Sequence, residues 1–433
     1  MQQKIEFYYS PSFIIMNAHF SISCKDEDEM SLVHESELAV CYGLESPQER
    51  FGFQSILNDH RNKIDKIAPD IWKKVRWYIN DYDFLVKDPI INRAFYKYWE
   101  IINEFELFEH YQSDDTIFHG AEAPGGFIQG SNIYLQLENR MREQKVKPKN
   151  IVDEDGFTMV KPKKKMTPRL YKIFTISLNK DLPKYRTYNL PSYNKGIMNK
   201  NVLVSYGKDN TGDINNLENV FYIDNLAKKQ SNNGGFYLIS SDGGFDEGND
   251  FNNKEQLHYF LILNEIFSAV YLQKPGGSYI LKVFDIFTET SVHLLYLLNT
   301  LYSEVYIYKP KTSRPTNSEK YIVCKGFHDN SEYRTQVIRL LQVLSASLRK
   351  HPQQYAAFKL FRQVPNSFMN KIKECNQALL TRQCNYLEKA ILLCEDSAFI
   401  TNYETALDNS IERRRMVFKN WESTYNLDSY VPS

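Results

Sequence analysis

Between Ile117 and Phe327 the chain alternates between two kinds of segment, and this alternation constrains the fold more than any other feature. Short runs rich in β-branched and aromatic residues are separated by glycine-containing turns and longer amphipathic stretches. The runs are TIFHGAEAPGG, GFYLISSDGG, GGSYILKVFD, EVYIYKP and KYIVCKGF. Because this pattern is typical of strands joined by crossover helices, the sequence predicts an α/β fold.

Helical periodicity marks the segments on both sides of this region. From about Gln48 to Phe108 apolar residues recur at helical intervals, whereas residues 1–47 show no clear pattern. After Asn330 the apolar residues again follow i, i+3, i+4, i+7 spacing, at Val337, Leu340, Leu341, Leu344 and Leu348. We expect this C-terminal region to serve packing or partner binding, and nothing in it suggests chemistry.

Composition limits the classes of function. The 433 residues include 53 basic and 53 acidic side chains, so overall charge gives no argument for nucleic-acid binding, although a local basic cleft is compatible with it. Six cysteines without CxxC spacing argue against zinc and disulfide frameworks and favour a reducing compartment. We expect no signal peptide and no membrane span, because the apolar stretch HYFLILNEIFSAVYL is interrupted by Asn264 and Glu265.

A Lys- and Pro-rich segment from Met141 to Lys172 interrupts the α/β region. Its composition is typical of a solvated basic loop, and a specific contact with RNA is the alternative.

The first three β-rich runs end in polar or glycine residues, and ligands of open α/β sheets bind beyond the carboxyl ends of the strands. In AEAPGGFIQG, Pro124 fixes a turn while Gly125 and Gly126 permit close backbone approach to a nucleotide-like ligand. A simple tight turn is the alternative. The stretch lacks GxGxxG and GxxxxGK[ST] spacing, which argues against hydride and phosphoryl transfer.

Three charged residues border the later strands. Asp242 closes one strand, where it could simply form an Asx-turn. Lys282 interrupts an apolar run, and burial should lower its pKa toward the range of a base unless it lies on a solvated edge. Glu319 precedes a buried strand and therefore needs a cationic partner. If these strands are neighbours, a lysine flanked by two carboxylates suits general-base chemistry on a hydroxyl.

Several blocks resemble the FtsJ-like ribose 2′-O-methyltransferases, and within them the mRNA cap-1 and cap-2 enzymes. DGGFD, GGSYILKVFDIFT and KPKTSRPTNSEKYIVCKG are similar to the later blocks of these enzymes, and INRAFYKYWEII is similar to the helix that supplies their first catalytic lysine. The resemblance covers Pro89 to Phe327, with the basic insertion as a gap. It implies a Lys-Asp-Lys-Glu tetrad of Lys97, Asp242, Lys282 and Glu319; without it, Lys97 would read as a helix-surface lysine.

The resemblance also implies a fold and a domain organisation. The expected core is a Rossmann-like, class I S-adenosylmethionine-dependent methyltransferase, with a mostly parallel seven-stranded sheet and helices on both faces. We expect an N-terminal extension over 1–85, a methyltransferase domain over 86–330 with the basic insertion at about 140–175, and a helical C-terminal region over 331–433.

The implied reaction transfers a methyl group from S-adenosylmethionine to the ribose 2′-OH of a nucleotide at the 5′ end of capped mRNA. Lys282 is the expected base or proton-steering group, and Lys97 would stabilise the developing oxyanion. Asp242 and Glu319 would orient the lysines and offset their charge. No metal is needed.

Further residues are assigned by the same resemblance. YGKDNTGDI is similar to a cofactor-side loop, and the expected cofactor contacts are Glu122, Pro124, Gly125, Gly126, Phe127, Asp213 and Asp242. Contacts with RNA are expected from Ser313, Arg314 and Asn317. His119 stands where many cap-1 enzymes carry an acidic residue, and Glu-Ala-Pro-Gly is similar to cap-2 and large-DNA-virus forms.

Two other functions remain open: an FtsJ-like methyltransferase of ribosomal or transfer RNA, and a non-catalytic subunit that binds RNA or capping proteins. An intact tetrad argues against the latter, because a scaffold has no use for a buried charge cluster. Besides capped RNA, the expected partners are capping or transcription proteins, with no membrane. The bias toward Asn, Lys, Tyr and Ile suggests an AT-rich genome, such as that of a large DNA virus of eukaryotes. We expect an intracellular location: host cytoplasm or virion if viral, nucleus if cellular.

Overall fold

The computed structural model describes residues 19–23, 32, 40–41, 53–83, 89–145, 150–152, 158–160, 170–230, 235–244, 253–350 and 357–427. Most of the basic segment from Met141 to Lys172 lies outside the described residues, so neither interpretation of it is tested. The first 18 residues, on which the prediction about a signal peptide bears, also lie outside them.

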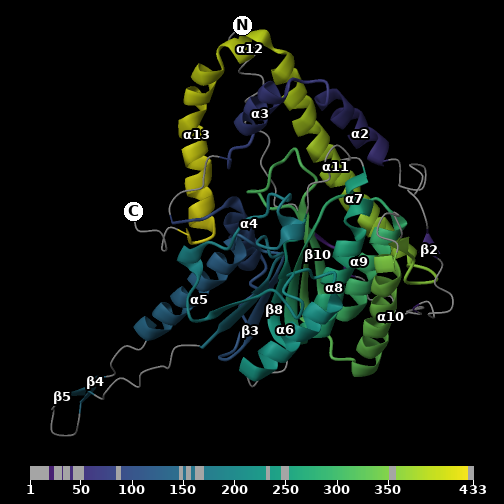
Figure 1. The fold of residues 1–433 in the computed structure, drawn as a ribbon. Helices are drawn as coiled ribbons and strands as arrows, with labels where there is room; N and C mark the ends of the chain where they lie inside the picture. The colour runs from purple at the N-terminus through teal and green to yellow at the C-terminus, as the bar shows by residue number, and fades with distance from the viewer. Residues whose placement is uncertain are drawn as a thin grey trace.

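An eight-stranded mixed sheet forms the centre of the molecule, in the order β1-β10-β11-β9-β8-β3-β6-β7 (Figure 1). Its strands are β1 (His19–Ser21), β3 (Thr116–Gly120), β6 (Lys172–Ile176), β7 (Val202–Ser205), β8 (Phe236–Ser241), β9 (Gln273–Val283), β10 (Tyr302–Tyr308) and β11 (Lys320–Phe327). Strands β7, β6, β3, β8 and β9 pair in parallel, whereas β11, β10 and β1 are added antiparallel. Two small antiparallel pairs lie outside this sheet: β2 (Val40–Cys41) with β12 (Ala357–Phe358), and β4 (Asn150–Val152) with β5 (Thr158–Val160).

Each of the five predicted β-rich runs forms a strand of the sheet, which confirms the α/β prediction. Strands β6 and β7 were not predicted, because β6 begins at the last residue of the basic segment and β7 has only four residues. The eighth strand, β1, comes from the N-terminal part of the chain and pairs with β10 beyond the seven strands expected.

Helices cover both faces of the sheet. Their bounds are α2 (Phe53–Ile64), α3 (Pro69–Tyr78), α4 (Arg93–Glu104), α5 (Gly126–Lys145), α6 (Leu217–Gln230), α7 (Lys254–Leu257), α8 (Tyr259–Leu272), α9 (Glu289–Leu301), α10 (Ser331–Lys350), α11 (Asn366–Glu395), α12 (Ser397–Thr401) and α13 (Tyr403–Thr424), with 3-10 turns η3 (Pro183–Tyr185) and η4 (Lys195–Ile197). One core joins the sheet to α6, α8, α9 and α10, and the other joins it to α4 and α5.

Side chains of β9 alternate between these two cores, as the period of a strand requires. Tyr279 and Leu281 enter the core of α8 and α9, whereas Ile280 enters the core of α4 and α5. Lys282 is two residues beyond Ile280 and therefore faces α4. The alternation thus directs this lysine toward the helix that carries Lys97.

The C-terminal region packs against the sheet and contributes residues to both of its cores. Helix α10 buries the predicted apolar residues, from Val337 to Leu348, against the sheet core. Helices α11, α12 and α13 form an arch over the sheet, with α3 beneath it and α2 alongside α11 (Figure 1). Phe368 and Ile372 of α11 belong to one core, and Phe418 and Trp421 of α13 belong to the other. The region therefore completes both cores.

Within the described ranges, no helix is both long and apolar enough to cross a bilayer. Helix α8 contains the apolar stretch examined above, and its Asn264 and Glu265 are buried. Cys324, Cys375, Cys384 and Cys394 have free thiols.

Candidate active site

Four elements bring four charged side chains together beyond the carboxyl ends of the parallel strands. Lys97 projects from α4, Asp242 follows β8, Lys282 lies near the end of β9 and Glu319 precedes β11. The Lys97 Nζ lies 2.7 Å from Oε1 of Glu319, and the Lys282 Nζ lies 3.3 Å from Oδ1 of Asp242. Their side chains are 12–15% exposed. The structure thus brings together all four residues of the predicted tetrad.

The register of the sheet explains this convergence. Strand β11 pairs antiparallel with β9 so that Tyr321 stands directly opposite Lys282. Directly opposite residues project from the same face of a sheet, and Glu319 is two residues before Tyr321, so it is directed to that face as well. Strand β8 pairs in parallel with β9 on the other side, which places Asp242 next to the end of β9.

The electrostatics of Lys282 differ from the sequence expectation. Burial alone would lower the pKa of Lys282, but the charges of Asp242 and Glu319, together with Glu265, raise it above its usual value. The prediction that burial makes this lysine a ready base was therefore wrong for the protein alone, because the neighbouring carboxylates outweigh desolvation. For Glu319, burial would raise the pKa, but nearby lysines, Lys97 first, lower it well below its usual range.

Two residues that sequence reasoning missed hold Asp242 in place. The hydroxyl of Tyr321 donates to Oδ1 of Asp242 over 3.1 Å, and the Lys282 Nζ donates to the Asp242 carbonyl over 2.6 Å. The next amide, of Gly243, donates to Oε1 of the buried Glu265 over 3.1 Å. Both polar atoms of the 242–243 peptide are thus fixed. Tyr321 could have been found from its place two residues after Glu319, whereas Glu265 looked like one polar residue in an apolar helix.

The loop between β10 and β11 is tied to α4 through the buried carboxylate of Glu100. Glu100 accepts hydrogen bonds from the amides of Lys311 and Thr312 over 2.7 and 3.3 Å. It also accepts from the Tyr308 hydroxyl and the Trp421 indole over 2.6 and 3.0 Å. Because Glu100 is one turn along α4 from Lys97, these bonds fix the loop of Glu319 relative to the helix of Lys97.

The three predicted RNA-contacting residues make contacts within the protein. The hydroxyl of Ser313 donates to Oε1 of Glu319 over 3.0 Å, and Arg314 Nε donates to both carboxylate oxygens of Asp83 at 3.1–3.2 Å. The side-chain oxygen of Asn317 accepts from the Lys309 Nζ over 2.5 Å. These contacts position the loop; contact with RNA stays a prediction.

The predicted Pro-Gly-Gly turn joins β3 to α5 and supports α4. Gly125 has a φ of +112°, which favours glycine, and a Cβ at Gly126 would lie 2.2 Å from Oδ1 of Asn92. Asn92 caps α4 by accepting from the Phe95 amide, so the missing side chain of Gly126 lets α5 approach the start of that helix. Glu122 is buried, and its Oε1 accepts from the Phe127 amide over 2.9 Å.

His119 lies in the core and not in an open site. Its ring nitrogens contact the hydroxyls of Ser240 and Ser131 at 2.6 and 3.0 Å. Burial lowers the pKa of His119 to about 3, which keeps the imidazole neutral at physiological pH.

A cleft of about 1570 Å³ opens in front of the charged cluster. Lys282 and Glu319 form part of its wall, with Asp213 and Asn215 on the sheet side. Helices α2 and α3, the segment 185–191 and helix α11 complete it with Arg61, Trp72, Arg76, Tyr185, Tyr188, Gln383 and Leu387. No described residue of the wall comes from Pro124–Phe127, where Ile197 packs against Gly125.

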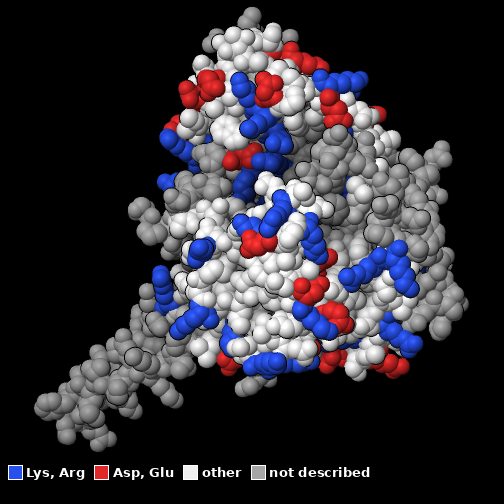
Figure 2. Space-filling view, viewed as in Figure 1, with Lys and Arg blue, Asp and Glu red and all other residues white. Residues whose placement is uncertain are grey.

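Figure 2 shows Lys and Arg side chains gathered in the hollow beneath the arch, with a few acidic side chains among them. An overall neutral chain thus carries a locally basic face, which is the arrangement that attracts anionic ligands.

A parallel α/β sheet whose carboxyl edge opens on a charged cleft defines a Rossmann-like enzyme fold. The chain belongs to the FtsJ-like methyltransferase family, whose model matches residues 90–327. Members of this family use S-adenosylmethionine as methyl donor.

Among the curated relatives, the cap-specific mRNA (nucleoside-2′-O-)-methyltransferase 1 of Dictyostelium discoideum is 27% identical over 86% of this chain and 47% of its own length. The inactive cap-specific mRNA (nucleoside-2′-O-)-methyltransferase 1B of Caenorhabditis briggsae is 32% identical over 42% of this chain and 22% of its own. A putative ribosomal RNA methyltransferase from Plasmodium falciparum has a solved structure that is 20% identical, with a TM-score of 0.33, and covers 55% of this chain and 97% of that chain. This chain spans about half the length of the Dictyostelium relative and about a fifth of the length of the Caenorhabditis relative.

Proposed function

We propose that the protein transfers a methyl group from S-adenosylmethionine to the ribose 2′-OH of a nucleotide at the 5′ end of capped mRNA. The observation that carries this proposal is the two ion pairs, Lys97 with Glu319 and Lys282 with Asp242, of which Glu319 and Lys282 line one cleft. Two amines and two carboxylates at an accessible carboxyl edge provide the groups that activation of a sugar hydroxyl needs.

The residues present fit S-adenosylmethionine. Asp213 and Asn215 provide oxygen acceptors on the wall next to β7, on the side where we place the adenosine. Asp242 lies between them and Lys282 along the edge of the sheet. When bound, the cofactor supplies an electrophilic methyl group on a positively charged sulfonium.

Lys282 is the proposed base in this reaction. The cofactor would supply the methyl group to the ribose oxygen, and the Lys282 amine would accept the proton that leaves the ribose hydroxyl. Lys282 must first release its own proton. The positive charge of the sulfonium would favour this release, because it disfavours the ammonium form of the lysine. Holding the reacting groups in line supplies ~7–11 kcal/mol of the barrier reduction.

The other three members of the tetrad set the position and charge of the amines. Lys97 would stabilise the oxyanion that develops on the ribose, while Glu319, whose pKa is lowered, stays ionised and orients Lys97. Asp242, held by Tyr321, orients Lys282. The four groups titrate as a coupled set, so apparent pKa values belong to the cluster.

RNA is the proposed occupant of the outer part of the cleft. Its volume exceeds the ~300–1,000 Å³ of a typical small-molecule pocket, which leaves room for nucleotides beside a cofactor. Arg61 and Arg76 offer charge for phosphates, and Trp72 and Tyr188 offer rings for stacking on bases. Asn317 lines this space. Together with Ser313 and Arg314 of the same loop, it would position the catalytic loop or the RNA backbone.

We also propose the domain division 1–85, 86–330 and 331–433, with residues 140–175 as an insertion. The relatives bear names of cap methyltransferases, which supports capped mRNA over ribosomal or transfer RNA. One relative of similar identity bears the name inactive, so the intact tetrad, and not identity, supports catalysis here. Partner proteins, a viral source and the compartment stay predictions.

The test is methylation of a short capped RNA with isotopically labelled S-adenosylmethionine, followed by nuclease digestion and mass spectrometry. We expect a labelled ribose methyl on the first or second transcribed nucleotide, and none on the same RNA without a cap. Equal labelling of uncapped or ribosomal RNA would favour the rRNA or tRNA alternative. Cofactor binding without any methylation would favour the non-catalytic subunit.

A further inference from the structure

We propose that Lys309 is a positioning residue that holds catalytic Glu319 against Lys97. The inference rests on the proposed function for the role of Glu319, but the contacts that carry it are independent of that role. Lys309 directly follows β10, ten residues before Glu319, at the start of the loop that leads to the site.

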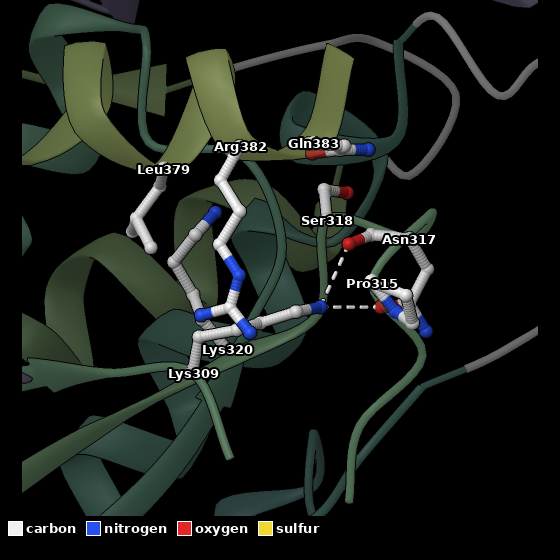
Figure 3. A pocket seen from close by; sticks show the side chains of 8 residues that line it. All are labelled: Lys309, Pro315, Asn317, Ser318, Lys320, Leu379, Arg382 and Gln383. Carbon is white, nitrogen blue, oxygen red and sulfur yellow. Dashed lines mark hydrogen bonds between the residues drawn. The ribbon is translucent and has the colours of Figure 1, made fainter. Parts of the chain in front are cut away.

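The ammonium of Lys309 bridges its own loop. Its Nζ donates to the carbonyl of Asn317 over 2.7 Å, to the side-chain oxygen of Asn317 over 2.5 Å and to the carbonyl of Glu319 over 2.6 Å. Figure 3 shows the Lys309 side chain extended under the loop, with its amine directed to Asn317. A lysine ammonium has three N–H donors, and all three are used on one short segment.

These bonds are strong because the amine is sequestered. Lys309 is only 8% exposed, and charge-assisted hydrogen bonds are about twice as strong as neutral ones. Burial lowers the pKa of Lys309 well below its usual value, and Lys320, Lys97 and Arg382 add to this, whereas the charge of Glu319 opposes it. The three acceptors, like Glu319, oppose this lowering, since hydrogen bonds to the ammonium form stabilise it.

The two ends of Glu319 are thereby fixed by different residues. Its carboxylate receives Lys97 and the Ser313 hydroxyl at Oε1, while its backbone carbonyl receives Lys309. The charge of Lys309 also helps to lower the pKa of Glu319. Without Lys309, its three acceptors lose this donor. Among the described residues, Glu319 is then held only through its carboxylate, by Lys97 and Ser313.

A second buried lysine, Lys320, lies beside Lys309 but, within the described residues, does not share its contacts with the loop. Lys320 lines the same small cavity of about 20 Å³, between the loop and Leu379, Arg382 and Gln383 of α11 (Figure 3). Its Nζ donates to the carbonyl of Phe284, beyond the end of β9, and to no atom of the 310–319 loop in the described residues. Of these two buried amines, Lys309 donates to the segment that carries Glu319, whereas Lys320 donates to the residue that follows β9.

Two measurements on the full chain test the proposal. Hydrogen exchange in the Lys309→Met variant is expected to be roughly tenfold faster in the segment 311–319 than in the wild type, because three hydrogen bonds are lost. Single-turnover methyl transfer to capped RNA is expected to fall about 10²-fold, with the Kd for S-adenosylmethionine unchanged, as a displacement of about 1 Å would produce.

Lys274→Met is the matched control. It removes another lysine that pairs with a buried carboxylate, Asp115, at the opposite edge of the sheet, so it is expected to lower stability without changing exchange in 311–319 or turnover. If residues 311–319 of Lys309→Met exchange at the same rate as in the wild type, the proposal is overturned, whether or not the protein methylates RNA. Equal exchange effects in both variants would also overturn it. Failure of the wild type to methylate capped RNA would instead contradict the proposed function.

Discussion

Each charged side chain at the carboxyl edge of the sheet has its partner on a different element. Lys97 of α4 pairs with Glu319 before β11, and Lys282 of β9 pairs with Asp242 after β8. Replacing a buried ion pair by apolar residues is often neutral or stabilising, whereas removal of one partner costs about 3–5 kcal/mol. Four such groups in one place are therefore poorly explained by stability and well explained by chemistry.

Glu265 gives the site a pH dependence of stability. Burial raises the pKa of its carboxyl to about 8, from an ordinary value near 4.5, so the folded protein binds a proton that the unfolded chain releases between these pH values. The free energy of unfolding should fall as pH rises through this window, by at most about 1.4 kcal/mol per pH unit. We predict that Glu265→Gln removes this slope, as measured by denaturant unfolding from pH 5 to pH 9.

Glu218→Gln on α6 is the control for that experiment. Its carboxyl is exposed and lies far along the chain from the cluster, so the same change of charge should leave the slope intact. An unaltered slope in Glu265→Gln would show that another group binds the proton.

Asp242, Lys282 and Glu319 could be singled out from the sequence, because each stands near the end of a recognisable strand. Lys97 was assigned only through the resemblance of its segment to a helix of the family. Lys309 and Glu265 could not be assigned, because their roles depend on contacts from one loop or helix to another. The pKa of Lys282 was predicted in the wrong direction, because a sequence shows burial but not the distances to Asp242 and Glu319 that decide the balance.

At the scale of elements, the loop between β10 and β11 is held by three helices. Helix α4 holds it through Glu100, α11 holds it through Gln383, whose Nε2 donates to the Thr316 carbonyl over 3.1 Å, and α13 acts indirectly, because Trp421 donates to Glu100. The loop that carries Glu319 is thus fixed by a helix of the family domain, α4, and by helices that follow this domain.

We predict that Trp421→Phe impairs the site from a distance. The change removes a donor from the buried carboxylate of Glu100, which should lower stability by about 1–3 kcal/mol and reduce turnover by loosening the loop. Tyr403→Phe, also on α13, is the control, because its hydroxyl donates over 3.2 Å to the carbonyl of Lys74 on α3. Denaturant unfolding and single-turnover assays of both variants measure this. Equal turnover in the two variants would argue against coupling through Glu100.

The element pattern was only partly predictable. Strands β8, β9 and β11 are long, β-branched and bounded by glycine or polar residues, which makes them visible in the sequence. Strand β7 is too short for a clear period, β6 begins at the end of the basic segment, and β1 is a strand because β10 offers it an open edge. Tertiary pairing decides such segments, since three residues alone cannot specify a strand.

At the scale of the whole molecule, the C-terminal region belongs to the same cores as the sheet. Val337 of α10 and Phe368 of α11 are fully buried in the core of α8 and α9, and Trp421 of α13 is buried in the core of α4. The sequence predicted the helices but not that they close both cores, because an apolar helix face does not reveal what it covers.

We therefore predict that a chain ending at residue 330 does not fold cooperatively. Removal of α10 and α11 exposes apolar residues of the sheet core, so the thermal unfolding transition seen by near-UV circular dichroism should be lost. A chain ending at Leu427 keeps every described helix and should retain the transition. A normal transition in the shorter chain would mean that the family domain is stable alone.

Lys282, placed between two carboxylates at the wall of the cleft, is the residue that we propose activates the ribose hydroxyl. Its role is tested by the single-turnover rate of methyl transfer to a capped RNA by Lys282→Ala and by the wild type, with the Kd for S-adenosylmethionine measured in parallel. We expect the variant to be slower by about 10²–10⁴-fold, with the Kd largely unchanged. An unchanged rate in Lys282→Ala would show that another group activates the hydroxyl.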